Sequence, residues 1–436
     1  MATQWRASKA EFERACRSIG GGLASSVRGS SRPHQIYFES GRGARLVDIE
    51  GNGYVDYALG WGPLLLGHVH PRVTEVIQAQ LERGVLFGGG NRHEIRAAEK
   101  LLTAIGWADR LLWTNTGTEA IQIALRLARA HTGRDVVVKI GGGYHGWHDT
   151  VLASCRDYGE GGSPVPHSKG QPASSVQDLR VALYNDLSVA EALFAAEPGR
   201  IAAVLIDPTS SNTGCVAPAP GYLEGLRRLC DEHGALLVYD EVVSGLRLGL
   251  DGAAGRFGVA PDLAAYGKAI GSGLGAAAVA GRADVIDLVT RGVLHSGTFN
   301  GNPLSTATVE VTLDVLGEDG VYPRIEETAQ ALADGVRSAA ADAGHTLAVH
   351  HLGATVLAAP GLSSMTGPDD YFAADWQWWN ELVAPAMLTR GIYLLPSGRL
   401  FLSTAHGADE VSETVAAFTD VFAEVASPAV RHATAV

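Results

Sequence analysis

Short apolar segments alternate with amphipathic segments between about residue 70 and residue 281, and no other feature of the sequence constrains the fold as strongly. The apolar segments that have the length and composition of buried strands are 136–140, 201–206, 235–242 and 276–281. The amphipathic segments place apolar residues at helical spacing and predict helices at 71–83, 93–105, from Gly117 to Gly133, and at 221–233. This alternation predicts an α/β fold with a mostly parallel central sheet flanked by helices.

The two ends of the chain follow a different pattern. Segments 44–50 and 53–59 alternate apolar and polar residues around Gly51-Asn52-Gly53, which predicts two strands joined by a turn. After about residue 305, helical segments flank a sheet-like middle, as in a smaller α+β domain. We therefore expect an N-terminal segment that packs with the small domain, a large domain and a C-terminal small domain: residues 1–65, 66–305 and 306–436. The Gly/Ser/Pro-rich segment 155–180 predicts a long loop of the lid or disordered kind.

Composition excludes several classes of function. The formal net charge is −13 and Lys and Arg form no cluster, so a nucleic-acid-binding protein is not expected. Apolar stretches stay shorter than about 18 residues and the charged start lacks a signal-peptide core, which argues against a membrane protein and for the cytoplasm. The cysteines form no C-x-x-C pair, which argues against a zinc ribbon or a redox motif.

Two charged residues stand where α/β enzymes bind their ligands. Asp240 lies near the end of segment 235–242, and ligands gather at the carboxyl ends of strands in open α/β sheets. Lys268 lies in GKAIGSGLG, between an apolar segment and glycines that let a ligand approach the backbone. Burial there would disfavour its ammonium form, as in lysines that act as nucleophiles or proton carriers. The alternatives are a carboxylate that caps the following loop and an exposed loop lysine.

Two glycine-containing motifs fit a flat, phosphorylated ligand. Asn115, Thr116, Gly117 and Thr118 precede a clear helix, and the free N–H groups and the dipole at a helix start suit a phosphate, although Thr and Asn are also ordinary N-caps. In GGGYHGWHD (141–149), glycines clear space and Tyr144 can lay its ring on a flat cofactor. His145 and His148 have the wrong spacing for one helix face and lack a third ligand, so a zinc site is not expected.

Together these motifs supply what the chemistry of pyridoxal 5'-phosphate (PLP) needs: a phosphate cup, an aromatic plate, a strand-end carboxylate and a lysine. The sequence resembles class III aminotransferases of PLP fold type I, most closely the glutamate-1-semialdehyde aminomutase branch. The segments that carry the resemblance extend over nearly the whole chain: LVDIEGNGYVDY, GWGPLLLGHVHP, TNTGTEA, GGYHG, YND, DEVVSG, GKAIGSGL and HSGTFNGNP. The resemblance implies a large PLP-binding domain and a smaller α+β domain formed from the N- and C-terminal parts.

The resemblance implies a role for each residue that matches a family motif. Lys268 would carry PLP as a Schiff base, and Asp240 would contact the pyridine nitrogen. Tyr144 would stack on the ring, and the phosphate would be bound at Gly117 and Thr118. The other residues of the implied cofactor-binding set are His145, Asn212, Val242 and Thr298.

Two of these residues carry further implications. Thr298, in HSGTFNGNP, would reach the phosphate bound by a partner subunit, so the resemblance implies a homodimer with active sites at its interface. Asn212 matches the last residue of the family's E-P-x-x-x-N stretch. In this chain the stretch is DPTSSN (207–212), so Asp207 stands where the family usually has Glu.

Three residues are candidates for substrate binding. Arg28 resembles the aminomutase arginine that clamps a substrate carboxylate, with a surface arginine as the alternative. Trp61, in GWGP, resembles a pocket wall, or is an ordinary core residue. Arg399 follows Pro396-Ser397-Gly398, where the aminomutase pattern carries a Phe-Glu pair; the missing glutamate argues against glutamate-1-semialdehyde as substrate. β-Amino-acid aminotransferases of the branch carry an arginine near this point, so Arg399 either binds a second carboxylate or caps a strand.

The first functional hypothesis is an aminotransferase that moves an amino group between a small carboxylate-bearing amino compound and a keto or aldehyde acceptor. Alternatives on the same scaffold are glutamate-1-semialdehyde 2,1-aminomutase, β-amino-acid aminotransferase and amino-acid epimerase. A noncatalytic PLP-fold binding protein is the alternative from another class. Dependence on an amine acceptor separates the enzymes, because a transaminase needs a second substrate whereas a mutase or an epimerase turns over alone.

Overall fold

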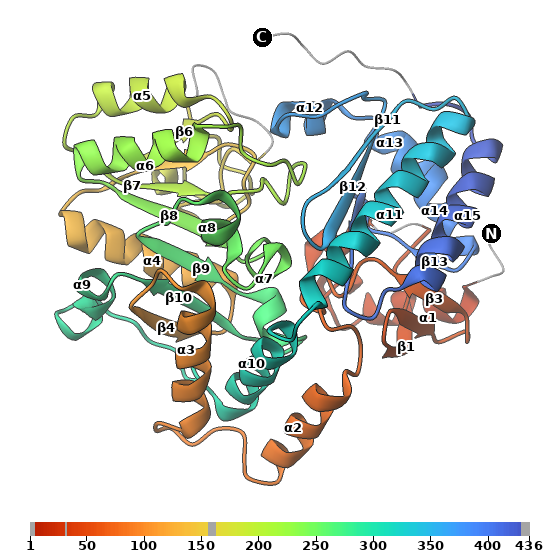
Figure 1. The fold of residues 1–436 in the computed structure, drawn as a ribbon, viewed down its shortest axis with the longest axis horizontal. Coiled ribbons are helices and arrows are strands. Elements are labelled where there is room, and N and C mark those ends of the chain that lie inside the picture. Colours follow the sequence, from red (N-terminus) through yellow and green to blue (C-terminus); the bar gives the residue numbers. More distant parts are fainter. Residues whose placement is uncertain (1–4, 31–32, 156–162, 429–436) are drawn as a thin grey trace. The chain divides into compact units, whose positions relative to one another are not determined.

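The structure is a computed structural model that describes residues 5–30, 33–155 and 163–428. The chain forms two compact units (Figure 1). Unit 1 comprises Met1–His70, Pro323–Met365 and Ala373–Val436, and unit 2 comprises Pro71–Tyr322 with Thr366–Phe372. Within the described ranges, no helix is both long enough and apolar enough to cross a membrane.

Unit 2 is built around a central sheet with the strand order β4-β10-β9-β8-β7-β5-β6. The strands are β4 (Arg110–Thr114), β5 (Val136–Ile140), β6 (Leu179–Ala182), β7 (Ile201–Ile206), β8 (Leu236–Glu241), β9 (Leu263–Tyr266) and β10 (Ala277–Gly281). Neighbouring strands from β6 to β9 pair in parallel, whereas β10 runs antiparallel to both β9 and β4. The predicted mostly parallel sheet is therefore confirmed.

The directions of these strands decide where the loops meet. Because β10 is antiparallel to β4 and to β9, β4 points the same way as β9 and the parallel strands beyond it. The loops that follow β4, β5, β7, β8 and β9 therefore all emerge at one edge of the sheet. Ligands of open α/β sheets bind at this carboxyl edge.

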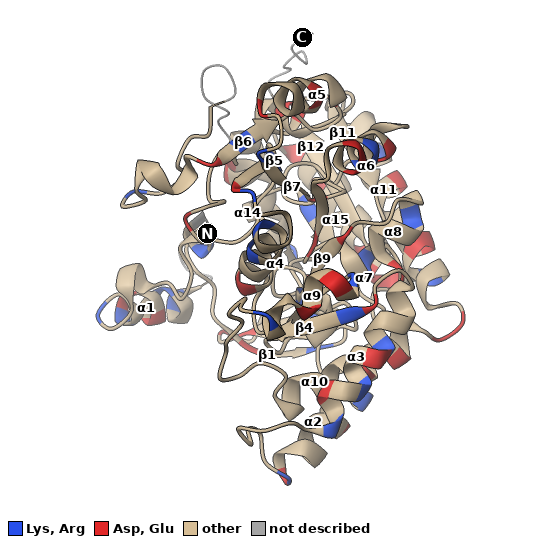
Figure 2. Ribbon diagram, turned by 90° about the vertical axis from the view of Figure 1, so that its left-hand side faces the viewer, with Lys and Arg blue, Asp and Glu red and all other residues tan. Residues whose placement is uncertain are grey.

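Helices cover the sheet of unit 2. Every residue of β5, β7, β8, β9 and β10 is buried, so both faces of these strands are covered. The helices are α2 (Pro71–Leu81), α3 (Arg92–Ile105), α4 (Gly117–Thr132), α5 (Leu187–Ala196), α6 (Tyr222–His233), α7 (Gly245–Leu248), α8 (Gly252–Phe257), α9 (Ala283–Ile286), α10 (Pro303–Leu316) and α12 (Pro368–Ala373). Basic and acidic residues alternate on the exposed side of α3 (Figure 2), while Ala97, Leu101 and Ile105 are buried.

The core of unit 2 lies between α4 and the sheet, where Ile121 and Leu125 join the strand residues Val137, Val238 and Val279 in one cluster. The sequence determines both ends of α4. Thr116 forms a capping box with Glu119 at the start, and Gly133 adopts the left-handed conformation at the end. The glycine stop that the sequence predicts for this helix is therefore present.

Unit 1 contains two smaller sheets, with the strand orders β1-β2-β3-β13 and β11-β12-β14. The strands are β1 (Phe38–Arg42), β2 (Arg45–Asp48), β3 (Gly53–Asp56), β11 (Leu347–His351), β12 (Thr355–Pro360), β13 (Ile392–Tyr393) and β14 (Arg399–Phe401). The helices are α1 (Arg6–Ala15), α11 (Val321–Asp342, from Pro323 on), α13 (Trp376–Trp378), α14 (Ala384–Thr389) and α15 (Ala408–Glu424). The turn predicted at Gly51-Asn52-Gly53 joins β2 to β3, which pair antiparallel.

The division of the chain into residues 1–65, 66–305 and 306–436 stays a prediction. In the structure, α10 lies in unit 2, where it packs against α2 and α3. Of the predicted loop at 155–180, residues 156–162 lie outside the described residues. The remainder contains a short 3-10 turn, Ala173–Val176, and the start of β6.

The aromatic core of unit 1 gives a stability prediction. Phe418 of α15 is fully buried, with its ring 5.2 Å from that of Phe422 and 6.1 Å from that of Trp379. Phe418→Ala should lower the free energy of unfolding by about 3–5 kcal/mol, because it removes buried surface and leaves a cavity. The matched control is Ser412→Ala on the exposed side of the same helix, expected within about 0.5 kcal/mol of wild type. Equal urea midpoints for the two variants would contradict this core assignment.

Candidate active site

The carboxyl edge of the sheet in unit 2 gathers most of the residues predicted to bind the cofactor. Each of the loops that emerge there contributes: Gly117 and Thr118 after β4, Tyr144 and His145 after β5, Asn212 after β7, Asp240 and Val242 at the end of β8, and Lys268 after β9. The contacts among these loops determine which ligand the edge can bind.

A buried hydrogen bond links the β5 and β8 loops. His145 Nδ1 lies 2.7 Å from Asp240 Oδ2, and the two side chains are 0% and 7% exposed. The backbone N–H of Val242 donates to Asp240 Oδ1 at 3.1 Å. Burial lowers the pKa of His145 although Asp240 opposes the shift, and its buried Nε2 has no hydrogen-bond partner among the described residues. Since a carboxylate accepts up to about four hydrogen bonds, Asp240 retains capacity for a further donor.

Two more buried carboxyl groups flank Asp240. Asp207 accepts hydrogen bonds from the backbone N–H groups of Thr209 and Ser211, at 3.1 and 2.8 Å. Burial, together with the charge of Asp240, raises the pKa of Asp207 to about 6. Glu241 accepts from Ala253 N at 2.7 Å, and burial raises its pKa to about 8. This shift favours the protonated form of Glu241 at neutral pH, and that form adds no negative charge beside Asp240.

A fully buried lysine, Lys139 of β5, secures the loop that carries Tyr144 and His145. Its Nζ donates to the carbonyl oxygens of Val151, at 3.0 Å, and Ala153. Burial lowers the pKa of this amine. Sequence reasoning missed Lys139 because VVVKI reads as an apolar strand. A lysine inside an otherwise wholly apolar segment was the available signal.

Glycines let the loops close on one another at the start of α4. A Cβ on Gly117 would lie 2.8 Å from both methyl carbons of Val242, and a Cβ on Gly146 would lie 2.6 Å from Thr118 Oγ1. Larger residues would hold the β4, β5 and β8 loops apart. Thr116 is the N-cap, as the alternative interpretation holds, and Gly117 and Thr118 are the first residues of a 16-residue helix. The N–H groups of such a first turn are free of intrahelical partners and suit a phosphate.

Lys268 begins a tight turn, Lys268–Gly271, directly after β9. The pairing of β8 with β9 sets Asp240 opposite Ala265, so Lys268 follows the neighbouring strand at the same edge. Lys268 is half-buried and has a φ of 45°. This left-handed conformation costs a non-glycine residue about 1–2 kcal/mol, and such strain clusters at functional sites.

The remaining predicted cofactor residues of unit 2 differ in exposure. Tyr144 is 41% exposed, and its pKa is raised by burial and, less, by the charges of Cys155 and Asp240. Asn212 is partly buried on the loop after β7, whereas Thr298 is exposed. Asn300, two residues after Thr298, accepts a hydrogen bond from Asn115 at 2.8 Å, which sets this segment beside the start of α4.

The three predicted substrate-binding residues lie in unit 1. Arg28 is exposed in the short turn Ser26–Ser30, and Trp61 is partly buried with a φ of 71°. Arg399 is buried on β14, where its Nε donates to Ser397 Oγ at 2.9 Å and its guanidinium lies 5.8 Å from the centre of the Phe401 ring. Their roles stay predictions.

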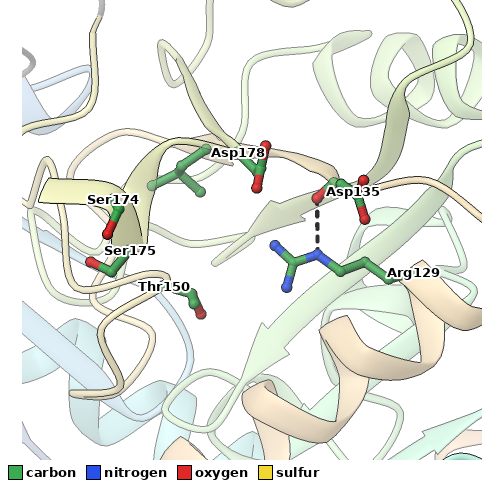
Figure 3. A pocket seen from close by; sticks show the side chains of 7 residues that line it. Arg129, Asp135, Thr150, Ser174, Ser175 and Asp178 are labelled. Atoms are coloured by element: carbon green, nitrogen blue, oxygen red, sulfur yellow. Dashed lines mark hydrogen bonds between the residues drawn. The ribbon is translucent and has the colours of Figure 1, made fainter. Parts of the chain in front are cut away.

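A separate polar cavity of about 330 Å³ lies away from this edge (Figure 3). Asp135 and Asp178, which line it, directly precede β5 and β6, so the cavity adjoins the opposite end of those strands. Its arginine, Arg129, donates from Nε to the carbonyl oxygen of Asp135 at 2.9 Å. None of the predicted site residues lines this cavity. Among the described residues, no group of three or more His, Cys, Asp or Glu is arranged to hold a metal ion.

Comparison with known proteins identifies the family. The model of the class-III aminotransferase family matches residues 26–420. This chain belongs to the class-III aminotransferases. A glutamate-1-semialdehyde 2,1-aminomutase from Roseiflexus castenholzii is 40% identical to this class-III aminotransferase over 436 residues, covering 97% of this chain and 98% of that protein.

Solved structures agree with this assignment. An omega-transaminase from Sphaerobacter thermophilus superposes with a TM-score of 0.90 at 32% identity, covering 95% of this chain and 97% of that one. A glutamate-1-semialdehyde aminomutase from Pseudomonas aeruginosa PAO1, in complex with PMP, has a TM-score of 0.89 at 25% identity, covering 97% and 95%. The class-III family and its fold type I architecture, both predicted from sequence motifs, are confirmed.

The raised pKa of Glu241 gives a prediction for stability against pH. The pKa is about 8 in the fold and ordinarily 4.5, so the folded chain keeps a proton that the unfolded chain releases between these values. The stabilisation from this proton is complete below about pH 4.5 and is lost as the pH rises towards 8. Relative to Glu241→Gln, the wild-type free energy of unfolding should fall by up to about 1.4 kcal/mol per pH unit in this window.

Urea unfolding at several pH values measures this difference. Glu232→Gln, at an exposed glutamate of α6, is the control and should follow the wild-type curve. Parallel curves for wild type and Glu241→Gln would show that Glu241 is not protonated in the fold.

Proposed function

We propose that this class-III aminotransferase binds PLP at the carboxyl edge of unit 2 and transfers amino groups with Lys268 as its reactive amine. The observation that carries the proposal is the buried His145–Asp240 pair, whose aspartate ends the strand next to the one that Lys268 follows. A buried carboxylate with capacity for one more donor, beside a strained lysine, fits a small ring that has a nitrogen at one end and an aldehyde at the other.

The residues present match the chemical groups of PLP. Gly117 and Thr118, at the start of α4, would hold the phosphate, and Asp240 would accept a hydrogen bond from the protonated pyridine nitrogen. Tyr144 would cover the ring, with Asn212 and Val242 completing its surroundings. The PMP bound by the Pseudomonas aeruginosa aminomutase, the aminated form of PLP, supports the same cofactor here.

When bound, PLP supplies an aldehyde that condenses with amines and a ring that accepts electrons from the bond that breaks. The chain supplies the proton handling. Asp240 would hold the proton on the ring nitrogen of a bound cofactor, and His145, with Val242 N, fixes the orientation of Asp240. Lys268 would be the residue that binds the cofactor aldehyde, and its Nζ would serve as the acid and base that carries a proton to and from the substrate carbon.

We further propose that the substrate is a small carboxylate-bearing amino compound. Arg28 and Arg399 carry planar guanidinium groups suited to carboxylates, and Trp61 is an apolar surface for the substrate's carbon chain. The orientation of Arg399 is restrained by Ser397 and Phe401, as expected of a group that binds a ligand at low entropic cost.

A glutamate-1-semialdehyde 2,1-aminomutase is the second candidate, favoured by the name of the Roseiflexus castenholzii relative. The missing Phe-Glu pair near Arg399 favours the aminotransferase instead. A β-amino-acid aminotransferase and an amino-acid epimerase are further forms of the same chemistry, and a noncatalytic PLP-binding protein is the alternative without turnover.

A homodimer is part of the proposal. The segment that carries Thr298 exposes two large apolar side chains, Leu294 at 70% and Phe299 at 60%. Leu294 lines a small cavity together with Glu119 and Gln122 of α4, so this apolar surface adjoins the helix that would bind the phosphate. A second copy that covered it would bring its own Thr298 towards that phosphate. We also propose that the enzyme acts in the cytoplasm, where its four cysteines, all free in the structure, would stay reduced.

The cofactor and the reaction can be tested together. Wild type incubated with PLP should gain a visible absorption band, and a screen of α-, β- and ω-amino acids should find donors that remove it. Lys268→Ala should lower turnover at least about a hundredfold, because the reactive amine and proton carrier is lost. The control Lys169→Ala, at an exposed lysine, should keep wild-type turnover.

Dependence on an amine acceptor then separates the candidates. Turnover only with an added keto or aldehyde acceptor supports the aminotransferase, whereas conversion of a single substrate supports the aminomutase or the epimerase. Protein that takes up no PLP would overturn the proposal in all its enzymatic forms.

The dimer has its own test. Leu294→Asp places a charge in the proposed interface and should convert a two-chain species to single chains with weakened PLP retention, measured by light scattering and dialysis. Val47→Asp, at an exposed valine of unit 1, should leave the mass unchanged. A wild type that retains PLP as a single chain would contradict the homodimer.

A further inference from the structure

The turn that carries Lys268 is tied to α10 by hydroxyl groups. Ser272, which ends the turn, has its Oγ 2.7 Å from Thr312 Oγ1 on α10. Thr312 is fully buried and also donates to the carbonyl oxygen of Thr308. A second tie follows at once, because Ser305 Oγ of α10 donates to the carbonyl oxygen of Gly275 at 2.9 Å. The segment from Lys268 to Gly275 therefore lies along α10 with fixed contacts at two points.

Both ends of this turn hold strained backbone. Lys268 has a φ of 45° and Ser272 a φ of 44°, and neither is glycine. Glycine would adopt this conformation without the steric cost that a Cβ imposes. A serine at position 272 retains the steric cost of the left-handed conformation. Its one gain over glycine is the hydroxyl group that hydrogen-bonds to Thr312.

The helix that receives the hydroxyl is a rigid support. Most residues of α10 are buried, and Asn302 caps its first turn by accepting a hydrogen bond from Ser305 N at 2.9 Å. A contact to such a helix fixes the position of the turn, whereas a contact to an exposed loop would not. Backbone strain that persists in a well-supported segment points to a functional position.

We propose that Ser272 and Thr312 are positioning residues that hold the Lys268 turn against α10, so that the lysine amine meets the cofactor at a fixed place. This inference rests on the proposed function of Lys268 as the PLP-binding lysine. Neither hydroxyl touches the cofactor in this account; both act through the backbone of the turn.

The proposal separates stability from cofactor retention. Ser272→Gly removes the hydroxyl and relieves the strain together, so the apoprotein should unfold at an equal or higher urea concentration than wild type. The same variant should nevertheless bind PLP about three- to tenfold more weakly, the range expected for one lost hydrogen bond. A merely structural role would move both quantities in the same direction.

Thr312 supplies matched variants on the other side of the contact. Thr312→Val keeps the shape but removes the hydroxyl, and should weaken PLP binding as Ser272→Gly does. Thr312→Ser keeps the hydroxyl and should stay within about twofold of wild type. The control is Thr308→Val, one turn before Thr312 on α10, which removes a buried hydroxyl that donates to the carbonyl oxygen of Leu304. It should retain wild-type PLP affinity.

Two measurements on the full-length protein decide the matter. One is the dissociation constant for PLP, from titration of the visible band, and the other is the pH dependence of that band in the holoenzyme. Ser272→Gly and Thr312→Val should shift both, and the double variant should be no worse than either single variant, because both remove one contact. Affinities and pH profiles equal to those of Thr308→Val would overturn the positioning role.

The failure of the underlying function gives a different result. Wild type that takes up no PLP, or that binds it through another lysine, overturns both proposals. Wild type that binds PLP through Lys268 while Ser272→Gly and Thr312→Val behave like it leaves the proposed function standing and removes only this inference.

Discussion

The hydrogen bond between His145 Nδ1 and Asp240 Oδ2 is the interaction on which the candidate site depends. β7 lies between β5 and β8, so this bond joins two loops that no strand pairing brings together. A carboxylate buried at this depth is stable only with donors or a cation, and removing a hydrogen-bond partner of a buried polar group costs about 1–3 kcal/mol, more for a charged group. His145 and the Val242 N–H therefore hold Asp240 in one orientation, in which we propose that it accepts a hydrogen bond from a ring nitrogen of the cofactor.

Close packing around this bond explains residue choices that the fold alone would not require. A Cβ on Gly143 would lie 2.4 Å from His145 Nε2, and one on Gly146 would collide with Thr118. Lys139, on β5 within the sheet, holds the last part of the same loop by donating a hydrogen bond to the carbonyl oxygen of Val151. The site thus combines glycines where two loops touch, a buried lysine that holds a loop, and left-handed backbone at Lys268. Each of these features lowers local stability but fixes the position of a loop or side chain in the site.

The sequence was most informative where a pattern has one physical meaning. Apolar strands in alternation with helices implied a parallel sheet, and the sheet then implied that the loops after its strands share an edge. Lys139 and Glu241 could not be identified in this way, because each lies within a segment whose other residues read as a buried strand. Their roles follow from contacts that only the fold creates: Lys139 donates to Val151 O, and Glu241 accepts from Ala253 N. The left-handed backbone at Ser272 could not be predicted from the sequence, because a serine ordinarily adopts negative φ. The roles of Arg28, Trp61 and Arg399 depend on where a substrate lies, which periodicity does not encode.

The central claim is that Lys268 is the amine that binds PLP in a site anchored by Asp240. Borohydride reduction of the PLP-loaded wild type, followed by proteolysis and mass spectrometry, tests it most directly because it fixes the cofactor where it is bound. We predict a single phosphopyridoxyl group on the peptide that contains Lys268. A label on Lys139 or on any other lysine, or protein that remains unlabelled, would contradict it.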